Sequence, residues 1–349
     1  MKLRKSNPLL LSAKMLLLTF TFSAVAISCS DDDDNSPAPQ QTVLEIAVAN
    51  SDFDVLEAAA RKAGTDVLNV LGGSTQITVF APTDAAFVAY LDVANEAAAL
   101  TAVNGLSPSA AADLLTFHVI AGSEIKAEDI AAGTTTVTTA RASNNKAFVT
   151  KSGANVTINN ARVTTANVDA SNGVIHIIDA VLAPPAGNIV SIATTGATAE
   201  SFNLLATALT KANLVTALQG AGPFTVFAPD DVAFLALLRT LTGNATLTEA
   251  QGIDAINAIT ATSDPLNLDE LTNVLQYHVV PNAAAFSINL TNNQTITTLK
   301  ANAPNQVTIA LGSSVTVDGA ASEPSTVALA NVAATNGVIH VIDRVLLPQ

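Results

Sequence analysis

The sequence predicts two tandem domains of the α+β class. Three motifs recur in the same order in both halves of the chain, helical patterns dominate the first part of each half, and strand patterns dominate the second. The chain has 349 residues, a length that suits two domains at roughly 150 residues each. Because 49% of the residues are hydrophobic and only 13% are charged, a disordered chain is excluded.

Residues 1–28 have the layout of a secretory signal peptide. A basic start precedes an uncharged stretch over 15–27, which is too short to span a bilayer as a helix. The segment Ala26–Cys29 resembles a bacterial lipobox, whose cysteine becomes the acylated first residue of the mature protein; the commonest form carries Leu in place of Ala26. Cys29 is the only cysteine, so a disulfide framework is excluded and lipidation is favoured. The alternative is an ordinary signal peptide with an incidental cysteine.

An acidic run follows that cysteine directly: Ser30, Asp31, Asp32, Asp33 and Asp34. Adjacent carboxylates repel one another, so the run predicts a solvated spacer, and residues 29–41 end in a Pro-stiffened linker. The run also resembles the surface-export signal of Bacteroidetes-type lipoproteins. We therefore expect an outer membrane lipoprotein facing outside, held in the membrane by N-terminal acyl chains. An anchor facing the periplasm is the alternative.

The charge of the mature chain bears on its partners. Removal of the signal peptide leaves 11 basic and 29 acidic residues, a formal charge of −18. This excess argues against nucleic-acid binding, which needs Lys and Arg to neutralise phosphates. Four histidines and no tryptophan leave few side chains for catalysis.

The internal duplication is visible in three motifs. They recur with offsets of 147, 160 and 164 residues: Thr78–Phe87 and Thr225–Phe234, Leu114–Val119 and Val274–Val279, Asn172–Asp179 and Asn336–Asp343. The growing offset places insertions of 13 and 4 residues in the second copy. Pro184–Gly187 is the natural boundary between the copies.

The first motif predicts a strand followed by a helix. Ile77–Ala81 is rich in β-branched and aromatic residues, which predicts a short buried strand that Pro82 ends. Thr83, or Asp230 in the second copy, then caps the next helix, because either side chain accepts from the free N–H groups of a first turn.

The rest of each copy predicts one more helix and then strands. Ser107–Pro108 combines a good N-cap with a first-turn proline, and the helix ends near His118. Thr- and Val-rich runs over 134–158 predict antiparallel hairpins. Asn172–Gly173 is a turn signal, and 174–182 predicts the closing strand.

On these motifs the chain resembles a tandem fasciclin-like domain protein. TVFAPTDAAF and TVFAPDDVAF match the family's first motif, TFHV and QYHV its central motif, and NGVIHIID and NGVIHVID its last. The departure is Phe117, where the family has Tyr and the second copy keeps Tyr277. The resemblance implies domains at 42–184 and 188–348, each a compact wedge-like β-sandwich with several packed helices. It also implies adhesion or protein and matrix binding, without a common enzymatic activity.

The central motif supplies the candidate interaction residues: Phe117, His118, Tyr277 and His278. In animal members of the family this region is linked to receptor contact. The alternative, which the apolar surroundings favour, is a structural pair that closes a helix. His176 and His340 in the closing strand predict buried, hydrogen-bonded imidazoles. We expect no catalytic residue, no metal site and no cofactor.

Other functions remain open at this point. A small-molecule-binding or envelope-complex protein of the periplasm would need a deep, partly polar pocket. A glycan platform would need exposed aromatic faces, and only Phe148, Phe224 and Phe286 have no counterpart in the other copy. The segment 243–265 in the second copy is a candidate for binding specificity or a tolerated extension.

Overall fold

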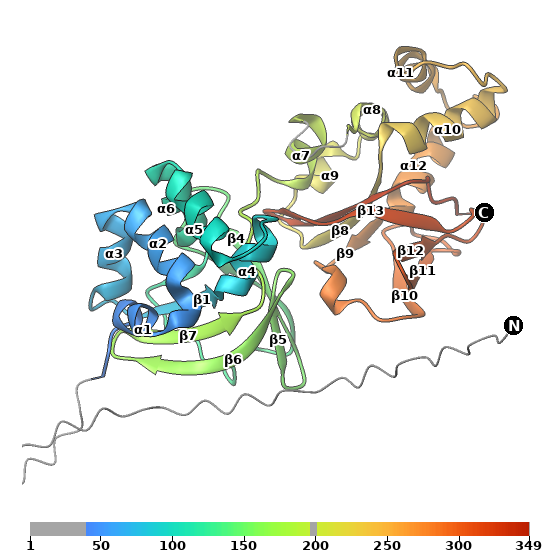
Figure 1. The fold of residues 1–349 in the computed structure, drawn as a ribbon. Coiled ribbons are helices and arrows are strands. Elements are labelled where there is room, and N and C mark those ends of the chain that lie inside the picture. The colour runs from blue at the N-terminus through green and yellow to red at the C-terminus, as the bar shows by residue number, and fades with distance from the viewer. Residues whose placement is uncertain (1–39, 196–200, 349) are drawn as a thin grey trace, which may run out of the picture. The chain divides into compact units, whose positions relative to one another are not determined.

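The computed structural model describes residues 40–195 and 201–348, which form two copies of one α+β domain (Figure 1). The predicted fold class is confirmed. The predicted signal peptide, Cys29, the acidic run and nearly all of the predicted spacer lie outside the described residues.

In the first copy, helices precede most of the strands. The helices are α1 (Val43–Ala49), α2 (Asp54–Ala63), α3 (Thr65–Gly72), α4 (Asp84–Tyr90), α5 (Glu96–Gly105) and α6 (Pro108–Thr116). The strands are β1 (Ile77–Pro82), β2 (Val119–Ala121), β3 (Gly133–Thr138), β4 (Lys146–Ser152), β5 (Asn155–Ile158), β6 (Ala161–Ala170) and β7 (Gly173–Ile178). They form a sheet in the order β2-β1-β7-β6-β5-β4-β3.

The second copy repeats this arrangement. Its helices are α7 (Ile189–Thr195), α8 (Asn203–Lys211), α9 (Val215–Leu218), α10 (Asp231–Thr242), α11 (Glu249–Ala258) and α12 (Leu268–Tyr277). Its strands are β8 (Phe224–Pro229), β9 (Val279–Pro281), β10 (Gln294–Thr297), β11 (Gln306–Leu311), β12 (Val315–Asp318), β13 (Ser325–Ala334) and β14 (Gly337–Ile342). The strand order, β10-β11-β12-β13-β14-β8-β9, is equivalent to that of the first copy.

The predicted helix caps are present. Thr83 Oγ1 accepts from the N–H of Ala86 at 3.3 Å, and Asp230 Oδ1 accepts from that of Ala233 at 2.7 Å. Ser107 caps α6 in the same way. These bonds satisfy first-turn N–H groups that have no partner within the helix.

Each sheet is mixed rather than purely antiparallel. The hairpins predicted over 134–158 are β3, β4 and β5, and they pair antiparallel. β7 pairs in parallel with β1, as β14 does with β8, a pairing that the sequence did not predict. The closing strand ends at Ile178 rather than Leu182, because the N–H of Leu182 bonds to a histidine ring instead of a neighbouring strand.

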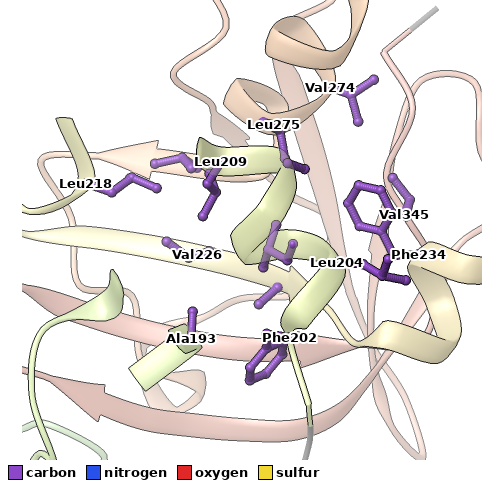
Figure 2. Packing of buried hydrophobic residues seen from close by; sticks show 14 of the residues in the cluster. Ala193, Phe202, Leu204, Leu209, Leu218, Val226, Phe234, Val274, Leu275 and Val345 are labelled. Carbon is purple, nitrogen blue, oxygen red and sulfur yellow. The ribbon is translucent and has the colours of Figure 1, made fainter. Parts of the chain in front are cut away.

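Two apolar cores lie on opposite faces of the central strands. Val79 and Ile175 belong to the core between helices and sheet, whereas Phe80 and Ile178 belong to the core between the two halves of the sheet. Successive side chains of a strand point to opposite faces, so a strand buried on both faces has apolar residues at nearly every position. This is the sandwich with packed helices that the resemblance implied. Figure 2 shows the helix-side core of the second copy, to which α8 contributes Leu204 and Leu209 and β8 contributes Val226.

The larger insertion of the second copy is distributed over several elements. Helix α10 has 12 residues where α4 has 7, and a longer connection follows α11. The segment 243–265 contains α11, the counterpart of α5, and it buries Leu247 and Ile259. It is therefore a partly buried helical region and not a separate surface loop. Of the helices described, none has the length and hydropathy needed to cross a membrane.

A buried asparagine holds the first helix of each copy. Asn172 Oδ1 accepts from the N–H of Val43 at 2.9 Å, and its Nδ2 donates to the carbonyls of Leu71 and Gly73 at 3.0 and 2.8 Å. Asn336 makes the corresponding three bonds in the second copy. One side chain thus connects α1, the end of α3 and the turn before β7.

Replacing Asn172 with alanine should lower the free energy of unfolding by about 3 kcal/mol, because three main-chain groups, two of them buried, lose their partner. Urea unfolding followed by circular dichroism measures the change. Asn155→Ala, at the exposed first position of β5, is the control and should stay within about 0.5 kcal/mol. Equal effects of the two substitutions would contradict the role given to Asn172.

Candidate functional site

The residues of the central motif lie in the domain cores. Phe117 and Tyr277 have 0% of their surface exposed, and His118 and His278 have 2%. A partner cannot reach these side chains while the domains are folded. The receptor-facing role implied by the resemblance therefore has no geometric support here.

The reason for this burial is the way each histidine closes its helix. His118 Nδ1 donates to the carbonyl of Leu114 at 2.9 Å, and its Nε2 accepts from the N–H of Leu182 at 2.9 Å. His278 makes the same two kinds of bond in the second copy. Only a neutral ring protonated on Nδ1 can make both bonds. Burial lowers the pKa of each of these two histidines to about 4.

The closing-strand histidines are buried as well and use the opposite tautomer. His176 Nε2 donates to the carbonyl of Ile125 at 2.8 Å, and its Nδ1 accepts from the N–H of Asn167 at 3.3 Å. His340 repeats this arrangement. Burial lowers the pKa of both rings below the usual histidine value. The four histidines are thus neutral and bound to main-chain groups, as the sequence predicted for the closing strand.

The tyrosine that the first copy lacks has a structural role in the second. Tyr277 Oη donates to the carbonyl of Gln306 at 2.6 Å and accepts from the N–H of Ala320 at 3.1 Å. Phe117 fills the equivalent core position without a hydroxyl. The departure from the family motif therefore removes two hydrogen bonds and leaves the apolar packing in place.

Three carboxylates gather beside the start of α2. Oxygens of Asp54, Asp84 and Glu96 lie within 4.8 Å of one another. Asp84 is buried and accepts from the N–H groups of Asp54 and Val55 at 3.2 and 2.8 Å, so it holds the first turn of α2. Its burial raises the pKa of the Asp84 carboxyl.

The second copy resolves the same crowding differently. Asp231 again holds the helix start, but Asn203 stands where the first copy has Asp54. Asn203 Nδ2 donates to Glu249 Oε1 at 2.9 Å, so a hydrogen bond from an amide replaces a contact between two carboxylates. The acidic cluster is best explained as an anchor for the helix.

Asp54→Asn should therefore raise the free energy of unfolding by about 0.5 kcal/mol, because an amide can donate to Glu96 where two carboxylates repel. The reciprocal change, Asn203→Asp, should lower it by a similar amount. Urea midpoints at pH 7 and low ionic strength measure both. Destabilisation by Asp54→Asn would contradict this account of the cluster.

Enclosed cavities occur at one equivalent place in the two copies. They lie between the first helix and the central strands, beside His118 and His278, with volumes of about 30 and 20 Å³. Their walls are apolar, and each has room for little more than one water molecule. They do not supply the deep, partly polar pocket that a small-molecule carrier needs.

The geometry of these two copies agrees with the comparison with known families. The fasciclin domain model matches residues 51–184 and 200–348. The chain belongs to the fasciclin domain family. The motifs that identify a fasciclin domain here are the strands, caps and histidines that build its core.

Relatives cover this chain to different extents. Protein sll1483 of Synechocystis sp. is 38% identical over 144 residues, which is 41% of this chain and 74% of that protein. Transforming growth factor-beta-induced protein ig-h3 of Sus scrofa is 30% identical over 198 residues, 56% of this chain but only 24% of that protein. A solved FAS1 domain pair from the insect cell adhesion molecule fasciclin I is 17% identical with a TM-score of 0.38, covering 87% of this chain and 95% of that one.

Proposed function

We propose that this chain is a lipid-anchored bacterial surface protein whose two fasciclin domains mediate adhesion through binding to a protein, matrix or neighbouring cell. The observation that carries the proposal is the double fasciclin match, because resemblance to this family implies adhesion or protein and matrix binding. The burial of all four histidines supports a binding role, because none of these rings is exposed to act as an acid or base.

The anchor is proposed from the sequence. Cys29 would carry the acyl chains, and Asp31–Asp34 would direct the protein to the outer face. A single acyl chain binds a membrane only marginally, so firm retention requires several chains, as in the bacterial lipoproteins that this N-terminus resembles. The acidic character of the mature chain suits a basic or cation-bridged partner, and many tethered copies make weak contacts effective.

Adhesion assays on cells that carry the full chain test this function. Deleting the gene should reduce attachment to matrix-coated surfaces or to neighbouring cells, and the full chain should restore it. Cys29→Ala should fail to restore it, because the secreted protein is no longer retained. The double substitution Ser107→Thr and Thr83→Ser, which keeps both helix caps, serves as the control and should restore attachment. Unchanged attachment of the deletion strain would overturn the proposal.

A further inference from the structure

An open groove runs along helices α7, α8 and α11 of the second domain, with a volume of about 480 Å³. Ala206 and Thr210 form part of its wall on α8, and Asn257 lies opposite them on α11. The volume lies within the range of small-molecule sites, roughly 300–1,000 Å³. Unlike the cavities beside the histidines, this groove is open to solvent.

The duplication shows which residues open the groove. Helices α2 and α8 correspond, because Asp84 and Asp231 hold their first turns through equivalent N–H groups. By this correspondence Ala206 and Thr210 replace Glu57 and Arg61, which form an ion pair on α2. Two long charged side chains have thus given way to two short ones, on an otherwise equivalent helix.

The walls offer hydrogen-bond acceptors together with the side-chain amide of Asn257. Thr207 Oγ1 donates to the carbonyl of Asn203 at 2.7 Å, and Thr210 Oγ1 donates to that of Ala206 at 2.8 Å. Their hydroxyl protons are therefore committed, so each hydroxyl can offer a ligand only its oxygen lone pairs. Glu249 adds a carboxylate, which already accepts from the amide of Asn203.

This chemistry selects a class of ligand. Acceptor oxygens beside an amide that both donates and accepts suit a ligand whose groups do both, as hydroxyl groups do. An anionic ligand would meet Glu249 and the negative charge of the chain. We infer that the groove binds a neutral carbohydrate. Since none of the described residues that line the groove is aromatic, the affinity rests on hydrogen bonds, and we expect a Kd of about 1 mM.

This site goes beyond the proposed adhesion function and is tested without cells. The purified full-length lipoprotein in detergent is titrated with neutral oligosaccharides of hexoses and N-acetylhexosamines, and binding is followed by saturation-transfer NMR. The double variant Ala206→Glu and Thr210→Arg rebuilds the ion pair of α2 and should weaken binding at least 10-fold. Thr207→Val, which removes one acceptor, should weaken it by a smaller factor.

A matched control exists on α10. Ala236 and Thr240 are exposed, four residues apart, and linked by the same Thr Oγ1 to Ala carbonyl bond, but they lie outside the groove. Ala236→Glu with Thr240→Arg should leave carbohydrate binding unchanged. Absence of binding to every neutral sugar at about 10 mM, or equal effects of the two double variants, would overturn the inference. Cell attachment is a separate measurement, so either proposal can fail while the other stands.

Discussion

Acidification is expected to destabilise the chain by about 3 kcal/mol for each of His118 and His278 between pH 7 and pH 4. Their folded-state pKa of about 4 lies below the ordinary value of 6.5, so the unfolded chain takes up protons first as the pH falls. The stabilisation is therefore complete above about pH 6.5 and is lost as the pH drops toward 4. Protonation of Nε2 would also break the bond that each ring accepts from the closing segment.

Urea unfolding at steps between pH 7 and pH 5 measures the histidine contribution, because most carboxylates stay charged in that window. His176 and His340 contribute in the same direction, since burial lowers their pKa as well. His118→Gln should remove about half of the pH dependence contributed by His118 and His278, since a glutamine amide does not titrate. Asp84, with its raised pKa, changes stability in the opposite direction at lower pH, and Asp84→Asn separates that contribution. A free energy of unfolding independent of pH between 7 and 5 would contradict the buried neutral state.

Gly173→Ala is expected to destabilise the chain by about 4 kcal/mol, because an added Cβ would lie 1.9 Å from the carbonyl oxygen of Ile77. The residue also has a φ of 144°, which residues other than glycine rarely adopt. Gly337 repeats this with 2.0 Å to the carbonyl oxygen of Phe224 and a φ of 156°. Both clashes involve main-chain atoms of the parallel strand pair, so no side-chain rotation relieves them.

Gly153→Ala is the control that distinguishes the cost of the steric clash from the cost of the positive φ. Gly153 has a φ of 60° and no atom within 4 Å of an added Cβ, so its substitution should cost only about 1 kcal/mol. Thermal and urea unfolding of Gly173→Ala, Gly337→Ala and Gly153→Ala give the comparison. Equal losses of free energy of unfolding for Gly173→Ala and Gly153→Ala would contradict the claim that the close approach of β1 and β7 requires glycine at position 173.

Local signals in the sequence were sufficient for the fold class and the caps. The duplication indicated two copies of one domain, and Thr83, Asp230 and Ser107 cap helices as their residue types predict. The caps depend on residues close in sequence, so the residue type at the cap position is enough to predict them.

Features that depend on distant partners were not predictable from one sequence. The parallel pairing of β1 with β7 joins segments from opposite ends of a domain. Asn172 recurs in both copies, which could have marked it, but its bonds to α1 and α3 require the folded chain. The groove appears only when α8 is compared with α2 in space, because Ala206 and Thr210 carry no motif.

Display of the two domains outside the cell is tested most directly by protease treatment of intact cells carrying the full chain. The chain should be cleaved from intact cells, whereas a variant with Asp31–Asp34 replaced by asparagine should be cleaved only after the outer membrane is permeabilised. Protection of the unaltered chain in intact cells, with cleavage after permeabilisation, would contradict surface display and favour a periplasm-facing anchor.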